Sequence, residues 1–191
     1  MDEVIRYLQQ ISPLRQQTVN SLSGLFHPAR LEKNQLFVEE GAYAQEIGFL
    51  ESGIVRAFFV NAQGKEYNKQ FFMGPAFIGA YSSLLTGQKN KIAQQALTPC
   101  TIWTAPYAHI EELYTRFHDL ERLGRKLAEY YFLEKEKKEL EMALLDAERR
   151  YLILQKEFPG IEQKIPQYHI ASYLGISPTQ LSRVRRTLSG R

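Results

Sequence analysis

Few folds accommodate the stretch from Pro166 to Arg186, because it encodes two short helices joined by a tight turn. Gly175 supplies the positive φ that ends the first helix and starts the turn. The second helix restarts at once, with Ser177 as its N-cap and Pro178 at its first position. Gln180, three residues after Ser177, completes a capping box. The sequence therefore predicts a helix-turn-helix.

The second of these helices has two faces of opposite character. Its apolar stripe consists of Leu181, Val184 and Leu188, which helical spacing brings to one side. The other side carries hydroxyls and arginines without an acid, namely Thr179, Ser182, Arg183 and Arg186, with Arg185 on the flank. Because such side chains suit base edges and phosphates, we predict that this face reads DNA, with Gln180 as a weaker candidate since the capping box uses it. The alternative is a structural helix pair whose basic face is only solvated.

Composition and charge narrow the class of protein. The sequence has 191 residues, 44% hydrophobic and 24% charged, which is enough for a core in one or two domains. No run approaches the ~18–20 apolar residues of a membrane span, and the N-terminus has acids where a signal peptide needs a basic start, so we expect a cytoplasmic protein without a membrane partner.

The single Cys100 excludes an intrachain disulfide and a four-cysteine cluster, and is expected to be a small buried side chain. Between Gly160 and Arg191 five basic residues face one acid, which makes this the nucleic-acid end.

Short apolar or alternating segments fill the region between residues 26 and 104. The expected strands are 26–31, 35–38, 47–51, 54–60, 67–72, 77–78, 93–97 and 101–104. Turn residues such as Ser52-Gly53 separate them. Regularly spaced short strands of this kind favour an all-β roll or sandwich. We expect two helices before it, at 2–11 and 14–25, and a small helical turn at 81–86 within it.

A helical period returns after Pro106. A short helix is expected at 107–117, and residues 119–147 then run without proline and with a single glycine, for about 43 Å. Its apolar seam is formed by Leu120, Leu123, Leu127, Tyr130, Tyr131, Leu140, Leu144 and Leu145. A helix this long is expected to be a connector and dimer seam, and the alternative is a helix lying along its own roll. With a further helix at 148–158 and a short strand or linker at 161–165, the predicted segments are 1–118, 119–147 and 148–191.

These elements, in this order, resemble the Crp/Fnr family of bacterial transcription regulators. The resemblance rests on Glu39-Glu40-Gly41, the run 47–53, Phe77-Ile78-Gly79, and the run 171–177 leading into 181–184. It implies an α+β fold, with an N-terminal double-stranded β-helix (jelly-roll) effector domain, a long dimerisation helix and a C-terminal winged-helix-like helix-turn-helix domain. It also implies a homodimer on two-fold symmetric double-stranded DNA, base-reading positions at Thr179 and Arg183, and RNA polymerase as a further candidate partner.

The sequence departs from the family pattern in the effector pocket. Members that bind cyclic AMP carry an acid directly after the glycine that follows the strand ending at Ile78, and an arginine in the following phosphate segment. Here Gly79 is followed by Ala80, and the phosphate segment 89–92 has lysines and no arginine. We therefore expect no cyclic AMP binding, while a different small effector and a roll without an effector stay open. An effector would contact Gly79, Ala80, Ser82, Ser83, Lys89, Asn90, Lys91 and Tyr130 or Tyr131.

Further departures concern the C-terminus and other functions. The sequence stops at 189–191, where family members usually continue into a β-hairpin wing, so the wing is either naturally absent or the sequence is shortened. We expect weaker and more salt-sensitive DNA binding than the family norm. The four isolated histidines, and the lack of nucleophile, phosphate-loop or Cys-X-X-Cys motifs, predict neither a metal site nor an enzyme. An interaction module of this fold that no longer reads DNA is the alternative function.

Overall fold

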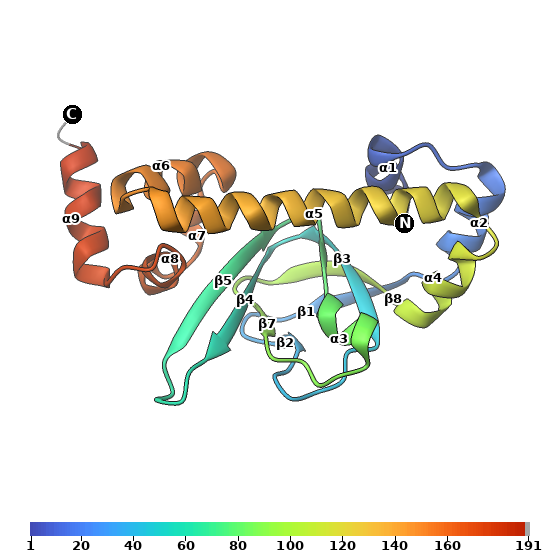
Figure 1. The fold of residues 1–191 in the computed structure, drawn as a ribbon, viewed down its shortest axis with the longest axis horizontal. Helices are drawn as coiled ribbons and strands as arrows, with labels where there is room; N and C mark the ends of the chain where they lie inside the picture. The colour runs from blue at the N-terminus through green and yellow to red at the C-terminus, as the bar shows by residue number, and fades with distance from the viewer. Residues whose placement is uncertain (190–191) are drawn as a thin grey trace. The chain divides into compact units, whose positions relative to one another are not determined.

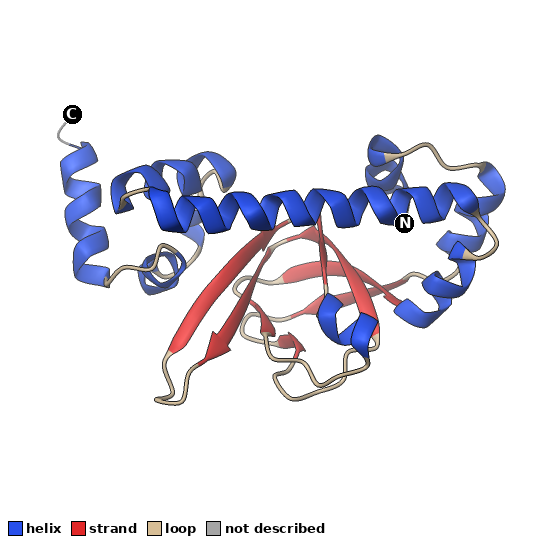
Figure 2. Cartoon of the chain, viewed as in Figure 1, coloured by secondary structure: helices blue, strands red, loops and turns tan. Residues whose placement is uncertain are grey.

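The computed structural model describes residues 1–189, so Gly190 and Arg191, the end of the predicted DNA-binding segment, lie outside the described residues. The chain divides into two compact units. The first contains Met1–Ala57 and Phe71–Phe132, and the second contains Phe58–Gln70 and Leu133–Arg191. Figures 1 and 2 show the elements of each unit. The predicted three-segment division stays a prediction.

The β-region between residues 27 and 106 folds into two four-stranded sheets, counted over the described residues. One sheet has the order β1 (His27–Leu31), β8 (Cys100–Pro106), β3 (Glu46–Ser52) and β6 (Ala76–Ile78). The other has the order β2 (Leu36–Val38), β7 (Ala93–Ala96), β4 (Ile54–Val60) and β5 (Glu66–Met73). Antiparallel pairing brings Phe49 opposite Trp103 between β3 and β8. This is the predicted roll, and β4 and helix α3 (Tyr81–Thr86) have the expected bounds.

The interior of the roll is built from apolar side chains of several strands, and β4 is buried over five consecutive residues, 54–58. The buried cluster consists of Leu31, Leu50, Val55, Ile78, Ala96, Cys100 and Ile102. Cys100 is 4% exposed, which confirms the expectation of a small buried side chain. Burial raises the pKa of its thiol, and the sulfur lies 3.2 Å from the Thr98 carbonyl oxygen, to which it donates. The thiol is therefore a packing group.

Helices α1 (Asp2–Ile11), α2 (Gln16–Ser23) and α4 (Tyr107–Tyr114) gather around the first part of α5 (His118–Leu144), as Figure 1 shows. Their shared core includes Val4, Leu8, Leu22, Phe49, Phe77, Ile110, Leu113, Leu120 and Leu123. The start of α5 is tied to α2 because Asp119 accepts hydrogen bonds from the Arg15 N–H at 2.7 Å and the Thr18 hydroxyl at 2.9 Å. The first part of the long helix thus packs within the unit that contains the roll.

The second unit contains the C-terminal part of α5 and the helices α6 (Ala147–Glu157), α7 (Ile161–Lys164), α8 (Gln167–Tyr173) and α9 (Pro178–Ser189). Its buried apolar residues include Tyr151, Leu154, Phe158, Ile161, Ile165, Ile170, Tyr173, Leu174 and Leu181. The strand or linker expected at 161–165 is instead α7. Gly160, at φ 73°, ends the preceding turn, and a single turn of helix then buries Ile161 completely.

Candidate nucleic-acid interface

The turn between α8 and α9 has the predicted geometry. Gly175 has φ 69°, in the left-handed region that favours glycine. The Gln180 side-chain oxygen accepts from the Ser177 N–H at 2.9 Å, and the Gln180 N–H donates to the Ser177 hydroxyl at 3.2 Å. These two bonds form the predicted capping box. The carboxamide of Gln180 is thereby used inside the protein.

Helix α9 presents to solvent the side chains that the sequence analysis selected. Leu181 on its apolar stripe is 1% exposed, so this face is fixed in the core of the unit. Exposed side chains on the helix are Thr179, Gln180, Ser182, Arg183, Arg185 and Arg186. The Ser182 hydroxyl donates to the Pro178 carbonyl at 3.1 Å, which leaves its oxygen as an acceptor. The helix thus holds a hydroxyl and arginine face away from its own core.

Arg185 differs from its neighbours because it pairs with an acid of the same unit. Its Nε lies 3.3 Å from a carboxylate oxygen of Glu162 on α7. Glu162 also accepts hydrogen bonds from the Tyr151 hydroxyl at 2.6 Å and the Gln155 amide at 2.9 Å. Burial, and then the bond to Glu162, raise the pKa of Tyr151 to about 12, so this hydroxyl is a donor at neutral pH. Part of the Arg185 charge is therefore balanced within the protein.

Two of the predicted effector residues have structural partners. Ser83 is 4% exposed, and its hydroxyl donates to the Gln88 carbonyl at 2.6 Å and accepts from the Ala44 N–H at 3.1 Å. Asn90 is 8% exposed, and its amide nitrogen donates to the Ile92 carbonyl at 2.5 Å. These side chains join loops of the roll. Of the other candidates, Ala80 is buried, Gly79 is half-buried, and the exposed residues are Ser82, Lys89, Lys91, Tyr130 and Tyr131.

Gln94 is a buried polar residue that sequence reasoning missed. It is 4% exposed on β7, and its amide nitrogen donates to the Gly79 carbonyl at 3.0 Å. Within the described part of the chain, its side-chain oxygen has no hydrogen-bond partner. A glutamine at an inward strand position, between Ala93 and Ala96, was the available signal. The backbone of Gly79 is thus joined to β7 by the carboxamide of Gln94.

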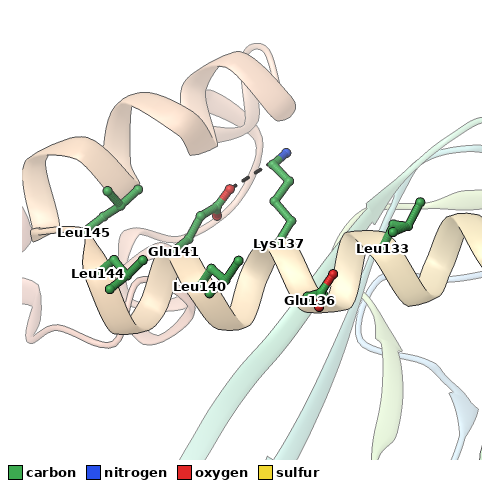
Figure 3. Close-up of a pocket in the computed structure, with 7 residues that line it drawn as sticks. All are labelled: Leu133, Glu136, Lys137, Leu140, Glu141, Leu144 and Leu145. Atoms are coloured by element: carbon green, nitrogen blue, oxygen red, sulfur yellow. Dashed lines mark ion pairs between the residues drawn. The ribbon is translucent and has the colours of Figure 1, made fainter.

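The C-terminal part of α5 carries an exposed apolar stripe. Leu133, Leu140 and Leu144 are 60%, 54% and 74% exposed. They line an open groove together with Glu136, Lys137, Glu141 and Leu145, as Figure 3 shows. Leu120 and Leu123 in the first part of the helix are instead 3% and 2% exposed. The first part of the long helix therefore packs within its own unit, whereas the apolar stripe of the last part is exposed, and the expected dimer seam stays a prediction.

No group of three or more histidine, cysteine, aspartate or glutamate side chains could hold a metal ion among residues 1–189. No helix in the described part of the chain is both long and apolar enough to cross a membrane.

The comparisons with known proteins agree with this architecture. Residues 28–117 match the model of the cyclic nucleotide-binding domain. The structure of FixK2 from Bradyrhizobium japonicum has a TM-score of 0.74 at 16% identity, over 87% of this chain and 85% of that one. The c-di-GMP-responsive global regulator CLP from Xanthomonas campestris has a TM-score of 0.70 at 16% identity, over 92% of each chain. A protein from Eubacterium rectale assigned to the crp/fnr family of transcriptional regulators has a TM-score of 0.72 at 14% identity, over 92% of this chain and 84% of that one.

A search of the curated proteins found no match. Identities of 14–16% establish likeness of fold. At that level the predicted α+β class is confirmed, with its roll, long helix and C-terminal helical part. The chain therefore shares the fold of the Crp/Fnr transcription regulators, and its residues 28–117 match the model of the cyclic nucleotide-binding domain.

Proposed function

We propose that the chain is a homodimeric regulator that reads a two-fold symmetric site on double-stranded DNA through α9. The observation that carries this proposal is the exposed face of α9, where Thr179 and Arg183 project from a helix whose opposite side is anchored by Leu181. A capped helix with this face can enter the major groove, whose base edges arginine and threonine recognise. We place the protein in the cytoplasm, with RNA polymerase as a candidate partner and no catalytic activity.

The exposed stripe on α5 supports pairing with a second copy. Leu133, Lys137, Leu140 and Leu144 follow one another at intervals of four, three and four residues, which is the spacing of a coiled-coil seam. The Nζ of Lys137 in this seam lies 2.6 Å from a carboxylate oxygen of Glu157 on α6, so the lysine charge is paired within the same chain. Two copies joined along the stripe would place their α9 helices in successive major grooves about 34 Å apart.

The roles along α9 follow from exposure and charge. Arg183 would take a guanine edge, supported by Thr179 and Ser182, since arginine binds guanine with two parallel hydrogen bonds. Arg186 would hold a phosphate. Arg185 would make a weaker phosphate contact, because Glu162 competes for its guanidinium.

The roll does not fit cyclic AMP as its effector. Ala80 stands where an acid would hold the ribose, and Asn90 in the phosphate segment is bonded to backbone carbonyls. CLP, which shares the fold, is described as responsive to c-di-GMP. We therefore propose that any effector is a molecule other than cyclic AMP. It would act by favouring one arrangement of the two long helices of the dimer.

Selection of bound sequences from a random duplex pool at moderate salt tests the proposed function. We expect a two-fold symmetric motif, which would identify a dimeric sequence-specific regulator. Salt-sensitive binding without a motif would contradict sequence reading by the chain alone and would lead to a repeat with c-di-GMP added. A folded dimer that binds no duplex at any salt would support the interaction-module alternative.

A further inference from the structure

The distal part of the β4–β5 hairpin belongs to the same compact unit as the helix-turn-helix. Residues 58–70 group with 133–191, although β4 and β5 continue as strands into the roll. Asn68 on β5 and His169 on α8 are 6% and 4% exposed. Two buried polar side chains, about a hundred residues apart in sequence, thus meet where the hairpin contacts the first helix of the helix-turn-helix.

Four hydrogen-bond contacts join these elements. The Asn68 N–H donates to the Ser172 hydroxyl at 3.0 Å, and the Ser172 hydroxyl reaches the Glu66 carbonyl at 3.3 Å. The Asn68 amide nitrogen donates to the His169 carbonyl at 2.9 Å and lies 3.2 Å from the His169 Nδ1. Because the amide nitrogen is a donor, Nδ1 accepts and the imidazole proton is on Nε2. We call Glu66, Asn68, His169 and Ser172 the hairpin clasp.

The same helix is held by α5 through a neighbouring residue. The Lys138 ammonium lies 4.0 Å from the centre of the Tyr173 ring, in a cation–π contact. Lys138 also lies 3.4 Å from a carboxylate oxygen of Glu141, which is 7% exposed. Helix α8 therefore contacts both the hairpin and the long helix. The buried Leu174, which caps the C-terminus of α8, and the buried Leu181 of α9 lie in the core of the same unit, so α9 shares this constraint.

We propose that Asn68 is a positioning residue that sets the spacing of DNA half-sites the dimer accepts. This inference rests on the proposed function. Base contacts would come from α9 alone, whereas the clasp fixes the orientation of α8, and with α8 that of α9, relative to α5 and the hairpin. In a dimer paired along α5, the two helix-turn-helix units can adapt to a longer or shorter site by turning relative to that helix. A buried clasp resists such turning, because each donor or acceptor that it releases would be left without a partner.

The test compares the parent chain with Asn68→Ala and Ser172→Ala, using Gln63→Ala, an exposed residue at the tip of the same hairpin, as the matched control. Each full-length protein is titrated with a duplex carrying one half-site of the motif selected by the parent chain, and with symmetric duplexes whose half-site separation changes by one base pair at a time. We expect unchanged half-site affinity in all four proteins. Discrimination between the best and next-best spacing should fall by about fivefold or more in the two clasp variants, as the loss of a buried hydrogen bond predicts.

The outcomes separate this inference from the proposed function. A parent-like spacing preference in both clasp variants overturns the positioning role while leaving DNA reading intact. Loss of half-site affinity along with spacing preference overturns it too, because the clasp would then only hold the head folded. If the parent chain selects no motif, the proposed function fails and the inference fails with it.

Discussion

The Nε of Arg185 lies 3.3 Å from a carboxylate oxygen of Glu162, so an acid on α7 holds one of the arginines of the reading helix. The contact joins α9 to a carboxylate that also accepts from Tyr151 and Gln155. A partly exposed pair of this kind contributes little to stability, but it changes how much positive charge α9 offers to a phosphate. Under the proposed function, the pair would therefore tune the affinity of α9 for DNA.

Replacing Glu162 with Gln should strengthen DNA binding on all sequences alike. The glutamine can still accept from Tyr151, while the Arg185 charge is no longer balanced by an acid. If one more phosphate per head is neutralised, the slope of log affinity against log salt should steepen by about 0.9 per head. Fluorescence anisotropy titrations between low and moderate salt measure this slope. An unchanged slope would show that Arg185 does not reach the backbone.

Arg183→Ala should relax specificity at one base position of each half-site. The loss of discrimination there is expected to be about 1–3 kcal/mol, since a bidentate arginine–guanine contact is removed. Arg186→Ala is the matched arginine variant, because this exposed side chain lies on the same helix and is assigned to a phosphate. It should weaken binding to all sequences equally. Competition titrations with single-base variants of the motif distinguish the two patterns, and equal weakening by Arg183→Ala would make it a phosphate contact.

Leu140→Glu should weaken self-association. The leucine is 54% exposed on the stripe of α5, and pairing would bury one such side chain from each copy. We expect a dimer dissociation constant raised by about tenfold or more, because full burial of a leucine is worth about 1.5–3 kcal/mol. Leu152→Glu on α6 is the control, since Leu152 is 50% exposed and lies off the stripe. Sedimentation equilibrium measures both, and equal effects in the two variants would place the interface elsewhere.

Asp119 should stabilise the protein at neutral pH and lose this effect in acid. Burial acts to raise its pKa, but hydrogen bonds from the Arg15 N–H and the Thr18 hydroxyl hold the pKa below its usual value. A lowered pKa means that the folded state favours the ionised form, so the stabilisation is present above the unfolded-state pKa of about 3.9 and disappears as pH falls through the folded-state pKa.

Thermal unfolding of the parent and Asp119→Asn at a series of pH values checks this dependence. The difference in Tm should be largest near neutral pH and should narrow as the pH falls below about 4. Glu40→Gln, at an exposed loop position, is the control and should leave the Tm profile close to that of the parent. A difference that stays constant down to the acid limit would mean that the Asp119 charge makes no contribution.

Sequence periodicity predicts most elements of the fold because turn residues bracket them. β4 has the expected bounds since Gly53, at φ 107°, and Gly64, at φ 77°, lie in the turns on either side of it. The periodicity predicts a long helix that reaches residue 147, but α5 ends at Leu144. The helix stops there because Asp146 caps α6, with its carboxylate accepting a hydrogen bond from the Arg149 N–H at 2.9 Å. That N-cap was readable in the sequence, whereas a single turn of helix such as α7 is too short to carry a periodic signal.

The candidate site was predictable only along a single helix. The exposed face of α9 follows from helical spacing, since Leu181 and Arg183 are placed on different sides by the 3.6-residue repeat. The contact between Arg185 and Glu162 and the clasp between Asn68 and His169 join residues that are distant in sequence. Such partners depend on how helices pack, and no local pattern of residues specifies them.

Interference by guanine N7 methylation on the selected duplex tests the central claim most directly, because it reports contacts in the major groove at single bases. The account predicts that methylation of one guanine in each half-site blocks the parent chain, with the two positions related by the two-fold axis and about one helical turn apart. Arg183→Ala should be insensitive to the same methylation. Binding of the parent chain that no methylated guanine disturbs, or interference that persists unchanged in Arg183→Ala, would contradict reading of DNA by Arg183 on α9.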